Sequence, residues 1–348
     1  MYPNVSIIVL NWNGWEDTIE CLESLYQINY PNYNVIVVDN GSKDVSIKKI
    51  KEYCDGKIKI KSEFFNYTEK NKPIKLFEYC ENDLKRFECD KIHFLSYSSN
   101  EKIILIKNFE NKGYTDGNNI GMDFILEYLD SEYLMILNND IVVDEYFLKE
   151  LMAVTINNKN IGILGPTNMS YDKPEEIQSR GAKMNFWTGG WRALDRDMSN
   201  QKMNPMEVDF VGGAAFMIKR EVVEKIGVFY SPYFANWEET DYCIKAKKNG
   251  FKVFCVPKSK IWHKVSSSIS INNPNRIYWI LRNNIIFMRR NAKIRYFPSF
   301  FIFYFLLRIP SFLYWGFQKN TVRNSFKLIQ MVIKATLDGI TFNINKTK

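Results

Sequence analysis

The architecture of this chain is indicated most clearly by one stretch, Tyr133-Leu134-Met135-Ile136-Leu137-Asn138-Asn139-Asp140-Ile141-Val142-Val143. Its apolar first half is typical of a buried strand, and two amides and a carboxylate follow before apolar residues resume. Asn and Asp are favoured turn residues, so a strand-to-turn junction is one interpretation. Polar groups at the end of a buried strand are costly to desolvate unless something binds them. A divalent cation that holds a diphosphate is therefore the other interpretation.

Two further strands near the N-terminus end in polar residues in the same way. Residues 5–10 form an apolar run that leads into Asn11-Trp12-Asn13-Gly14, and residues 34–38 form another that leads into Asp39-Asn40-Gly41-Ser42. Ligands of parallel α/β sheets bind beyond the carboxyl ends of the strands. The three polar clusters therefore predict one binding site at one edge of a sheet.

Amphipathic stretches separate these strands and predict flanking helices. They cover residues 19–26, 45–53 and 118–129, and further strands are expected at 57–61 and 103–106. Strands that alternate with helices predict an α/β domain with a mainly parallel central sheet.

A polar stretch rich in Lys, Glu and Asn, residues 62–102, interrupts this alternation. It carries aromatic residues such as Phe64, Phe77 and Tyr79, which a disordered segment would lack. We therefore expect an ordered insertion within an α/β domain that covers residues 1–272.

The charge of the chain is distributed unevenly. Hydrophobic residues make up 46%, which excludes an intrinsically disordered chain, and the net charge is +8. From Pro274 onwards, thirteen Lys or Arg stand against the single acid Asp338, so this part carries +12 and the first 273 residues carry −4. A basic, aromatic-rich tail suits an anionic surface, either lipid headgroups or nucleic acid. Its dense apolar aromatics do not resemble an RNA-binding pattern, so we expect a membrane surface and no nucleic acid.

The most apolar part of this tail is residues 296–317. As one helix it would extend roughly 33 Å, about the thickness of a bilayer core. Arg308 near its middle and Pro310 argue against a simple span. We expect a helical, membrane-associating region over residues 273–348 whose helices lie against the cytoplasmic leaflet. A packed helical subdomain that covers the α/β domain is the alternative, and a transmembrane hairpin is less favoured.

The cysteines and the N-terminus predict the compartment. The six cysteines lack the spacing of a zinc site or a disulfide framework, which indicates reduced thiols in the cytosol. Residues 1–4 carry no basic segment, and the apolar run that follows is too short for a signal peptide. We expect a cytoplasmic protein held peripherally on the cytoplasmic face of the cell membrane.

Three more segments carry candidate chemistry. Residues 111–121 form a Gly- and Asn-rich loop that leads into a helix; it suits a phosphate or a helix cap, and it is not a GxGxxG fingerprint. The acidic run Glu238-Glu239-Thr240-Asp241 would complement a helix dipole or supply a general base. His263 is either structural or completes a metal shell that Asp140 begins.

Taken together and in order, these blocks resemble the family 2 inverting glycosyltransferases with a GT-A fold, in the rhamnosyltransferase- and galactofuranosyltransferase-like branch. The resemblance spans roughly the first 265 residues. The matching blocks are residues 5–14, 35–44, 111–121, 136–143, 209–219 and 229–245, and His263.

The resemblance implies roles for individual residues. Asp140 would be the last acid of a DxD-type motif and, with His263, would hold Mg²⁺ or Mn²⁺; Asn138 and Asn139 stand where such motifs place earlier residues. Glu239 stands where the family has its catalytic Asp, and Asp241 is the fallback base. The nucleotide-sugar site would comprise Asn11, Asn13 and Asp39 for base and ribose, Gly113 and Asn118 in a closing loop, Asn138, Asn139, and Gly213 from the 209–219 block.

The function that the resemblance implies is metal-dependent, inverting transfer of a sugar from a UDP- or dTDP-sugar. The acceptor would be a hydroxyl of a glycan or lipid-linked molecule in cell-surface polysaccharide synthesis. The alternative is a catalytically inactive, membrane-bound homologue that binds nucleotide or glycan. Glu239 in place of Asp, and the two Asn before Asp140, keep that alternative open.

Overall fold

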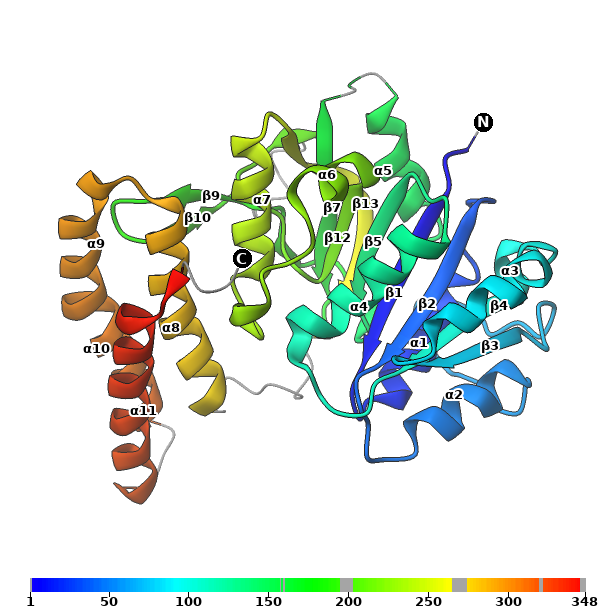
Figure 1. Cartoon of the computed structure of the whole chain (residues 1–348), viewed down its shortest axis with the longest axis horizontal. Coiled ribbons are helices and arrows are strands. Elements are labelled where there is room, and N and C mark those ends of the chain that lie inside the picture. The colour runs from blue at the N-terminus through cyan, green and yellow to red at the C-terminus, as the bar shows by residue number, and fades with distance from the viewer. Residues whose placement is uncertain are drawn as a thin grey trace.

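The computed structural model describes residues 2–156, 158, 160–194, 203–264, 274–318 and 322–344. It consists of an α/β part built on a large sheet and a group of C-terminal helices beside it (Figure 1). The α/β class predicted from the sequence is confirmed.

Eleven strands form the main sheet within the described residues. They are β1 (Val5–Asn11), β2 (Tyr33–Asp39), β3 (Lys75–Cys80), β4 (Lys102–Lys107), β5 (Tyr133–Asn138), β6 (Ile141–Val143), β7 (Ile161–Ser170), β8 (Ile177–Ser179), β11 (Met206–Glu207), β12 (Ala215–Lys219) and β13 (Lys252–His263). A separate hairpin pairs β9 (Ala182–Asn185) with β10 (Gly190–Ala193).

The strand order is β11-β13-β7-β12-β5-β1-β2-β4-β3, with β6 on β13 and β8 on β7. From β5 to β3 all neighbours are parallel, as are β13 and β7, whereas β12 runs antiparallel to both of its neighbours. The parallel half brings the polar strand ends together. Asn11 stands opposite Asp39, and Leu10 stands opposite Asn138.

Helices cover both faces of the sheet. They are α1 (Trp15–Leu25), α2 (Ser46–Cys54), α3 (Phe87–Leu95), α4 (Gly113–Tyr128), α5 (Phe147–Thr155), α6 (Arg220–Ile226) and α7 (Glu238–Lys248). The C-terminal helices are α8 (Pro274–Asn291), α9 (Phe297–Phe303), the π-helical turn η6 (Tyr304–Arg308), α10 (Ile309–Gln318) and α11 (Val322–Thr341).

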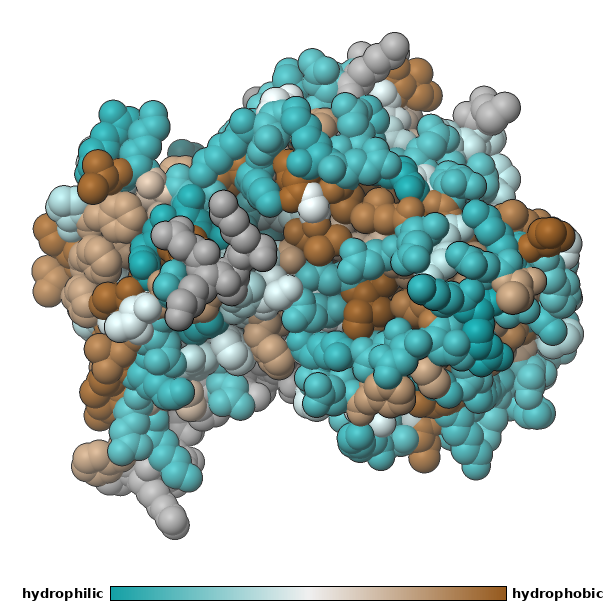
Figure 2. All heavy atoms as spheres, viewed as in Figure 1, coloured by the Kyte–Doolittle hydropathy of each residue, from teal (hydrophilic) through white to brown (hydrophobic). Residues whose placement is uncertain are grey.

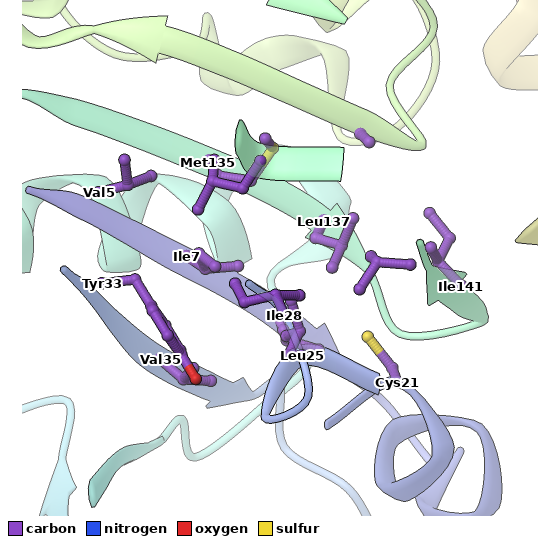
Figure 3. Close-up of a cluster of buried hydrophobic side chains, with 14 of the residues drawn as sticks. Val5, Ile7, Cys21, Leu25, Ile28, Tyr33, Val35, Met135, Leu137 and Ile141 are labelled. Carbon is purple, nitrogen blue, oxygen red and sulfur yellow. The ribbon is translucent and has the colours of Figure 1, made fainter. Parts of the chain in front are cut away.

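Alternation along the strands divides the core into two layers. Val5, Ile7 and Val9 of β1 pack with α1, α2 and α5 on one face, as part of the cluster in Figure 3. Ile8 of the same strand points to the opposite face, where α3, α4, α6 and α7 pack. A strand buried on both faces explains the continuous apolar run at residues 5–10.

Two expectations about the first hundred residues are wrong. Residues 57–61 form no strand; they are irregular backbone, and Ile58 and Ile60 pack against the core from there. Residues 62–102 are ordered as expected, yet they do not interrupt the alternation. They supply β3, which pairs with β4 at the sheet edge, and α3, which buries Phe87 and Phe94.

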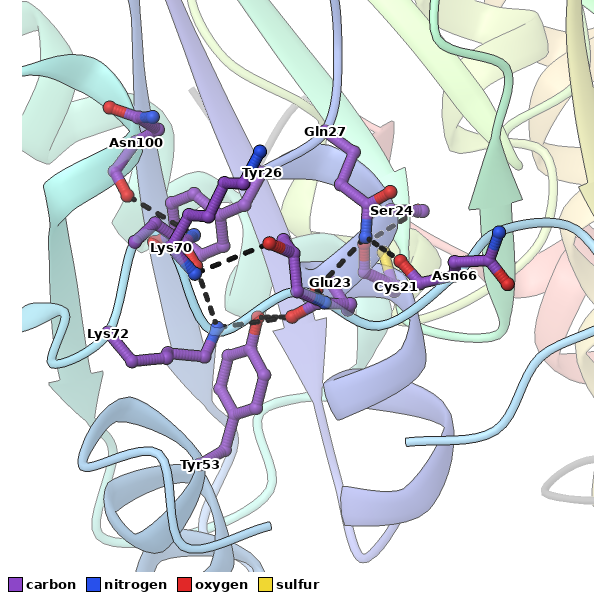
Figure 4. Close-up of polar contacts among 12 residues, drawn as sticks. Cys21, Glu23, Ser24, Tyr26, Gln27, Tyr53, Asn66, Lys70, Lys72 and Asn100 are labelled. Carbon is purple, nitrogen blue, oxygen red and sulfur yellow. Dashed lines mark hydrogen bonds and ion pairs between the residues drawn. The ribbon is translucent and has the colours of Figure 1, made fainter. Parts of the chain in front are cut away.

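The polar stretch that precedes β3 is attached to the domain by a buried ion pair (Figure 4). The carboxylate of Glu23 on α1 is fully buried and lies 3.1 Å from the ammonium of Lys72. The Tyr53 hydroxyl on α2 and the Gln27 amide donate to the same carboxylate at 2.8 and 2.9 Å, and the backbone N–H of Thr68 donates at 3.2 Å. Because every partner is satisfied, the network fixes structure and leaves no group for a ligand.

We expect Lys72→Met to destabilise the protein by about 3–5 kcal/mol, because it leaves the buried Glu23 carboxylate without its cation. Urea unfolding would measure the free energy of unfolding. The matched control is Lys59→Met: its ion pair with Glu69 is exposed at both partners, so the loss of unfolding free energy should be much smaller. Equal losses of unfolding free energy in the two variants would contradict a stabilising role of the buried Glu23–Lys72 ion pair.

Candidate functional site

A cleft of about 450 Å³ opens at the carboxyl edge of the parallel strands. Its walls come from the end of β1, the start of α4, the turn between β5 and β6, the loop before α7, the end of β13 and the start of α8. Five of the predicted site residues line it: Gly113, Asn138, Asn139, Asp140 and His263.

The ends of β1 and β2 are joined by side chains behind this cleft. The amide of Asn11 donates to Asp39 Oδ1 at 2.7 Å and to Ser42 Oγ at 3.1 Å, and the backbone N–H of Ser42 donates to Asp39 Oδ2 at 3.1 Å. Asn13 adopts a left-handed φ of 51°, and its side-chain oxygen accepts the N–H of Lys43 at 2.8 Å. These residues therefore fix the shape of the strand ends at this edge of the sheet, and their contact with the base and ribose of a nucleotide stays a prediction.

The expected closing loop is mostly helix. Gly113 is the first residue of α4, and Asn118 lies inside the helix, where its side chain is fully buried. Asn118 Nδ2 donates to the carbonyl of Tyr114, so Asn118 belongs to the helix rather than to a mobile loop. Gly113 has a φ of 80°, and a Cβ there would lie 2.5 Å from the ring of Phe234. Only glycine fits this contact between α4 and the loop before α7.

Asp140 and His263, 123 positions apart in the sequence, meet at the cleft. Pairing of β6 with β13 places His263 opposite Ile141, and His263 Nε2 lies 3.4 Å from Asp140 Oδ1. The N–H of Lys264 donates to the Asp140 carbonyl at 3.0 Å, and the Lys264 ammonium lies 2.6 Å from both Asp17 and Glu20 on α1. These contacts fix the end of β13 against α1 and hold the pair together.

This pair fits a divalent cation. Two ligands about 2.1 Å from one ion and at right angles are separated by about 3 Å, close to the observed spacing. The side-chain oxygen of Asn138 is also buried and has no hydrogen-bond partner. Asn139 is different, because its amide donates to Gly14 O at 3.2 Å and to Thr18 Oγ1 at 3.0 Å. The described residues contain no group of three or more His, Cys, Asp or Glu side chains around one point, so further ligands would come from substrate or water.

Two adjacent carboxyl groups begin α7. Glu238 and Glu239 each have a buried Oε2 atom without a hydrogen-bond partner. Burial raises the pKa of Glu238 well above its ordinary value, and the charge of Glu239 raises it further. Burial also raises the pKa of Glu239, and the contact with Glu238 opposes this in part. The pKa of Glu238 is therefore the more strongly raised of the two, and Glu238 takes up a proton before Glu239 as the pH falls.

Tyr114 and Gly213 connect the two acidic groups. The Tyr114 hydroxyl donates to the Gly213 carbonyl at 2.8 Å, and Gly213 lies against the carboxyl group of Glu239. Burial, followed by the charges of Glu238, Glu239 and Asp140, raises the pKa of Tyr114 well above its ordinary value. Tyr114 thus lines the same cleft as Asp140 and is bonded to the residue that lies beside the Glu239 carboxyl group.

Asp241 is not available as a base. It is buried, and its carboxylate accepts from Tyr233 at 3.1 Å, Asn291 at 2.5 Å and Arg290 at 3.3 Å. Arg290 also lies over the ring of Tyr230, with 3.5 Å to the centroid. The fallback assignment of Asp241 is therefore corrected: it joins α7 to α8.

The C-terminal region contributes a wall of the cleft, which fits the alternative of a packed helical subdomain, although the sequence pointed to no site residue in this tail. Asn275, Arg276 and Trp279 of α8 line the cleft. Trp279 stacks on Phe234, with ring centroids 4.9 Å apart and planes at 22°. One tryptophan in a tail rich in aromatic residues does not stand out in the sequence, because its contact with Phe234 depends on the packing of α8 beside α7.

Comparison with known proteins places the chain in a family. A family model described as "Glycosyltransferase like family 2" matches residues 3–280. The dTDP-rhamnosyl transferase RfbF of Shigella flexneri is 24% identical over 248 residues, covering 69% of this chain and 79% of that protein. The low-salt glycan biosynthesis hexosyltransferase Agl10 of Haloferax volcanii is 25% identical over 308 residues, covering 85% and 80%.

A solved structure shares the fold. It is the mannosyltransferase PcManGT from Pyrobaculum calidifontis in complex with GDP-Man and Mn²⁺, which matches with a TM-score of 0.55 at 13% identity and covers 98% of this chain and 88% of that one. The predicted GT-A fold is confirmed by this likeness. With a family model that covers most of its length, the chain belongs to the family 2 glycosyltransferases, enzymes that transfer a sugar from a sugar nucleotide.

Proposed function

We propose that this enzyme is a metal-dependent, inverting transferase that moves a sugar from a UDP- or dTDP-sugar to a hydroxyl of a glycan or lipid-linked acceptor. The observation that carries the proposal is the cleft that Asp140, His263 and Tyr114 line together, with the Tyr114 hydroxyl bonded to Gly213, which lies beside the Glu239 carboxyl group. The Asp140–His263 pair suits a cation that holds a diphosphate, and the Glu238–Glu239 pair suits the acceptance of a proton.

Asp140 and His263 would hold the cation, with Asn138 beside them. When bound, a divalent cation would supply charge stabilisation for the departing nucleoside diphosphate. A partner such as Mg²⁺ keeps few protein ligands when substrate phosphates provide the others, which is consistent with a pair rather than a cluster. The donor class is supported by a relative whose name states that it transfers from a dTDP-sugar.

Glu239 would act as the general base. Its carboxylate takes the proton of the acceptor hydroxyl while that oxygen bonds to the anomeric carbon. The bond from this carbon to the diphosphate oxygen breaks on the opposite face, so the configuration inverts. A carboxylate whose pKa is raised by burial is a stronger base than an exposed one, which suits this task. The acceptor would belong to cell-surface polysaccharide synthesis.

We expect Glu239→Gln to lower kcat by about 10²–10⁴-fold while nucleotide affinity stays within a few-fold, because the isosteric amide cannot take a proton. Glu238→Gln is the matched control: it keeps the shape and can still donate to Glu239, so its loss should be much smaller. Steady-state release of nucleoside diphosphate and calorimetric nucleotide binding would measure both. Unchanged turnover in Glu239→Gln would refute the base assignment.

The acid limb of the pH–rate profile should reflect the same pair. The pKa of Glu239 is raised, so activity is expected to fall as pH decreases through a value above that of an ordinary glutamate.

A donor screen with EDTA tests the cation. We expect release from one nucleotide sugar that requires Mg²⁺ or Mn²⁺, is lost with EDTA, and falls by at least about tenfold in Asp140→Asn and His263→Ala, because each removes a ligand. His93→Ala serves as a control, since it removes a histidine from α3, outside the cleft. Full activity in EDTA would contradict metal dependence. Nucleotide binding without release from any donor, with lipid-linked acceptor present, would favour the inactive homologue.

We also propose that the C-terminal helices hold the enzyme on the cytoplasmic face of the cell membrane. Among the described residues one stretch, Ile294–Tyr314, is long and apolar enough to cross a membrane by length and composition. Its buried side carries Phe300 and Tyr304, and Arg308 turns toward Asn284 of α8. A helix with one side packed on protein suits a position along the membrane surface rather than across it.

The outer side of these helices supports this position. Ile302, Leu306 and Leu307 are 58%, 68% and 56% exposed, and apolar atoms gather at this end of the molecule in Figure 2. An apolar groove of about 270 Å³ runs between the η6–α10 segment and α11. Exposed Lys293 and Arg295 at the start of this segment complement anionic headgroups.

Replacing Leu306 and Leu307 together by Glu should abolish flotation with vesicles that contain anionic lipid, because charges on the apolar face oppose insertion. Ile92→Glu is the control, since Ile92 on α3 is 85% exposed and remote in the fold. Membrane attachment through this face would be contradicted if the Leu306/Leu307 variant floats as well as the wild type. It would also be contradicted if the wild-type protein does not float.

A further inference from the structure

The loop that leads into the two glutamates has an unusual backbone. Phe234, Asn236 and Trp237 have φ values of 62°, 68° and 78°, and none of them is glycine. Residues with side chains rarely adopt this left-handed region, and several of them close together persist only where the surroundings hold them. Trp237 directly precedes Glu238, so the conformation of this loop sets where α7 begins.

Groups outside the loop bind its successive carbonyl oxygens. The Pro232 carbonyl accepts from Arg282 at 2.8 Å, and the Phe234 carbonyl accepts the N–H of Thr115 on α4 at 3.0 Å. The carbonyls of Tyr233, Ala235 and Asn236 all accept from one side chain, the amide of Asn283 on α8, at 2.8, 2.8 and 3.0 Å.

Asn283 is itself held in place. It is fully buried, and its side-chain oxygen accepts from Arg282 at 2.9 Å. This bond orients the amide so that its N–H groups face the loop. The indole N–H of Trp237 donates back to the carbonyl of Ile280 on the same helix at 3.2 Å. Helix α8 thus meets the loop from Pro232 to Trp237 through several hydrogen bonds in both directions.

We propose that Asn283 is a positioning residue for the catalytic glutamate. Its amide holds the left-handed loop, and the loop sets the direction in which the Glu239 side chain points from the first turn of α7. Asn283 need not touch substrate to act in this way. The inference rests on the proposed role of Glu239. The proposal gives α8 a role at the catalytic site, although α8 lies in the tail that was expected to associate with the membrane.

Asn284 offers a matched control at the next position of the helix. It is the same residue type and is also fully buried, but its amide donates to the Gly189 carbonyl in the β9–β10 hairpin at 2.8 Å. Asn283→Ala and Asn284→Ala remove equal side chains from equally buried positions. A loss caused only by weakened packing of α8 should therefore appear in both variants.

The first measurement is hydrogen exchange in the full chain, which does not depend on turnover. We expect Asn283→Ala to raise exchange in residues 230–240 and Asn284→Ala to raise it in the hairpin instead.

The second measurement is steady-state kinetics. The kcat of Asn283→Ala should fall by about 100-fold, which is the scale of a misplacement of about 1 Å, while the donor KM changes less than about threefold. Asn284→Ala should keep kcat within about threefold of wild type. If Asn283→Ala does not fold, Asn283→Ser, which retains one donor, is measured in the same way.

Each outcome decides the proposal. Unchanged exchange in residues 230–240 of the Asn283 variant overturns it, and so does faster exchange with undiminished kcat. Equal loss of kcat in both variants also overturns it, because the effect would then be general. If wild-type protein shows no turnover, the proposed function fails, whereas the exchange comparison still shows whether Asn283 holds the loop.

Discussion

Two neighbouring carboxyl groups at the start of α7 have to be kept together in a place with little water, and the rest of the site is arranged around this constraint. Burying charge is costly: burial raises the pKa of both carboxyl groups, most strongly that of Glu238, and backbone N–H groups at the start of α7 oppose this rise in part. Tyr114 and Gly213 close the space beside them, and the start of α7 follows a loop with left-handed residues that accepts hydrogen bonds from α8.

Patterns local to one segment were sufficient to predict the sheet and its polar edge. The runs that end in Asn11, Asp39 and Asn138 occupy neighbouring positions on parallel strands, as strand-end polarity suggests. The residues alone left His263 either structural or a partner of Asp140, and the resemblance of ordered blocks favoured the pairing, since no local pattern joins positions so distant. Alternation at residues 57–61 was misleading, because Ile58 and Ile60 reach the core without strand pairing, whereas β3 forms where the sequence looked merely polar.

Other features depend on partners that no sequence window contains. Asp241 resembles Glu239 in the sequence, and only the approach of Arg290 and Asn291 shows that it is structural. Asn283 is one of many asparagines, and its partners are backbone carbonyls of a loop more than forty positions earlier. Gly113 at the start of α4 likewise meets its close neighbour, Phe234, more than a hundred positions later in the sequence.

The contacts of α8 bear on how the enzyme can be made in quantity. Apolar tails are commonly removed to improve solubility, and the change in composition near Pro274 makes that position an obvious place to end the chain. Ending it there would discard Trp279 from the cleft, Asn283 from the loop and Arg290 from Asp241. Exchanging exposed side chains such as Leu306 and Phe326 for polar ones leaves α8 and its partner α11 in place. Surface redesign of the tail, rather than its deletion, is the route to a soluble enzyme with an intact site.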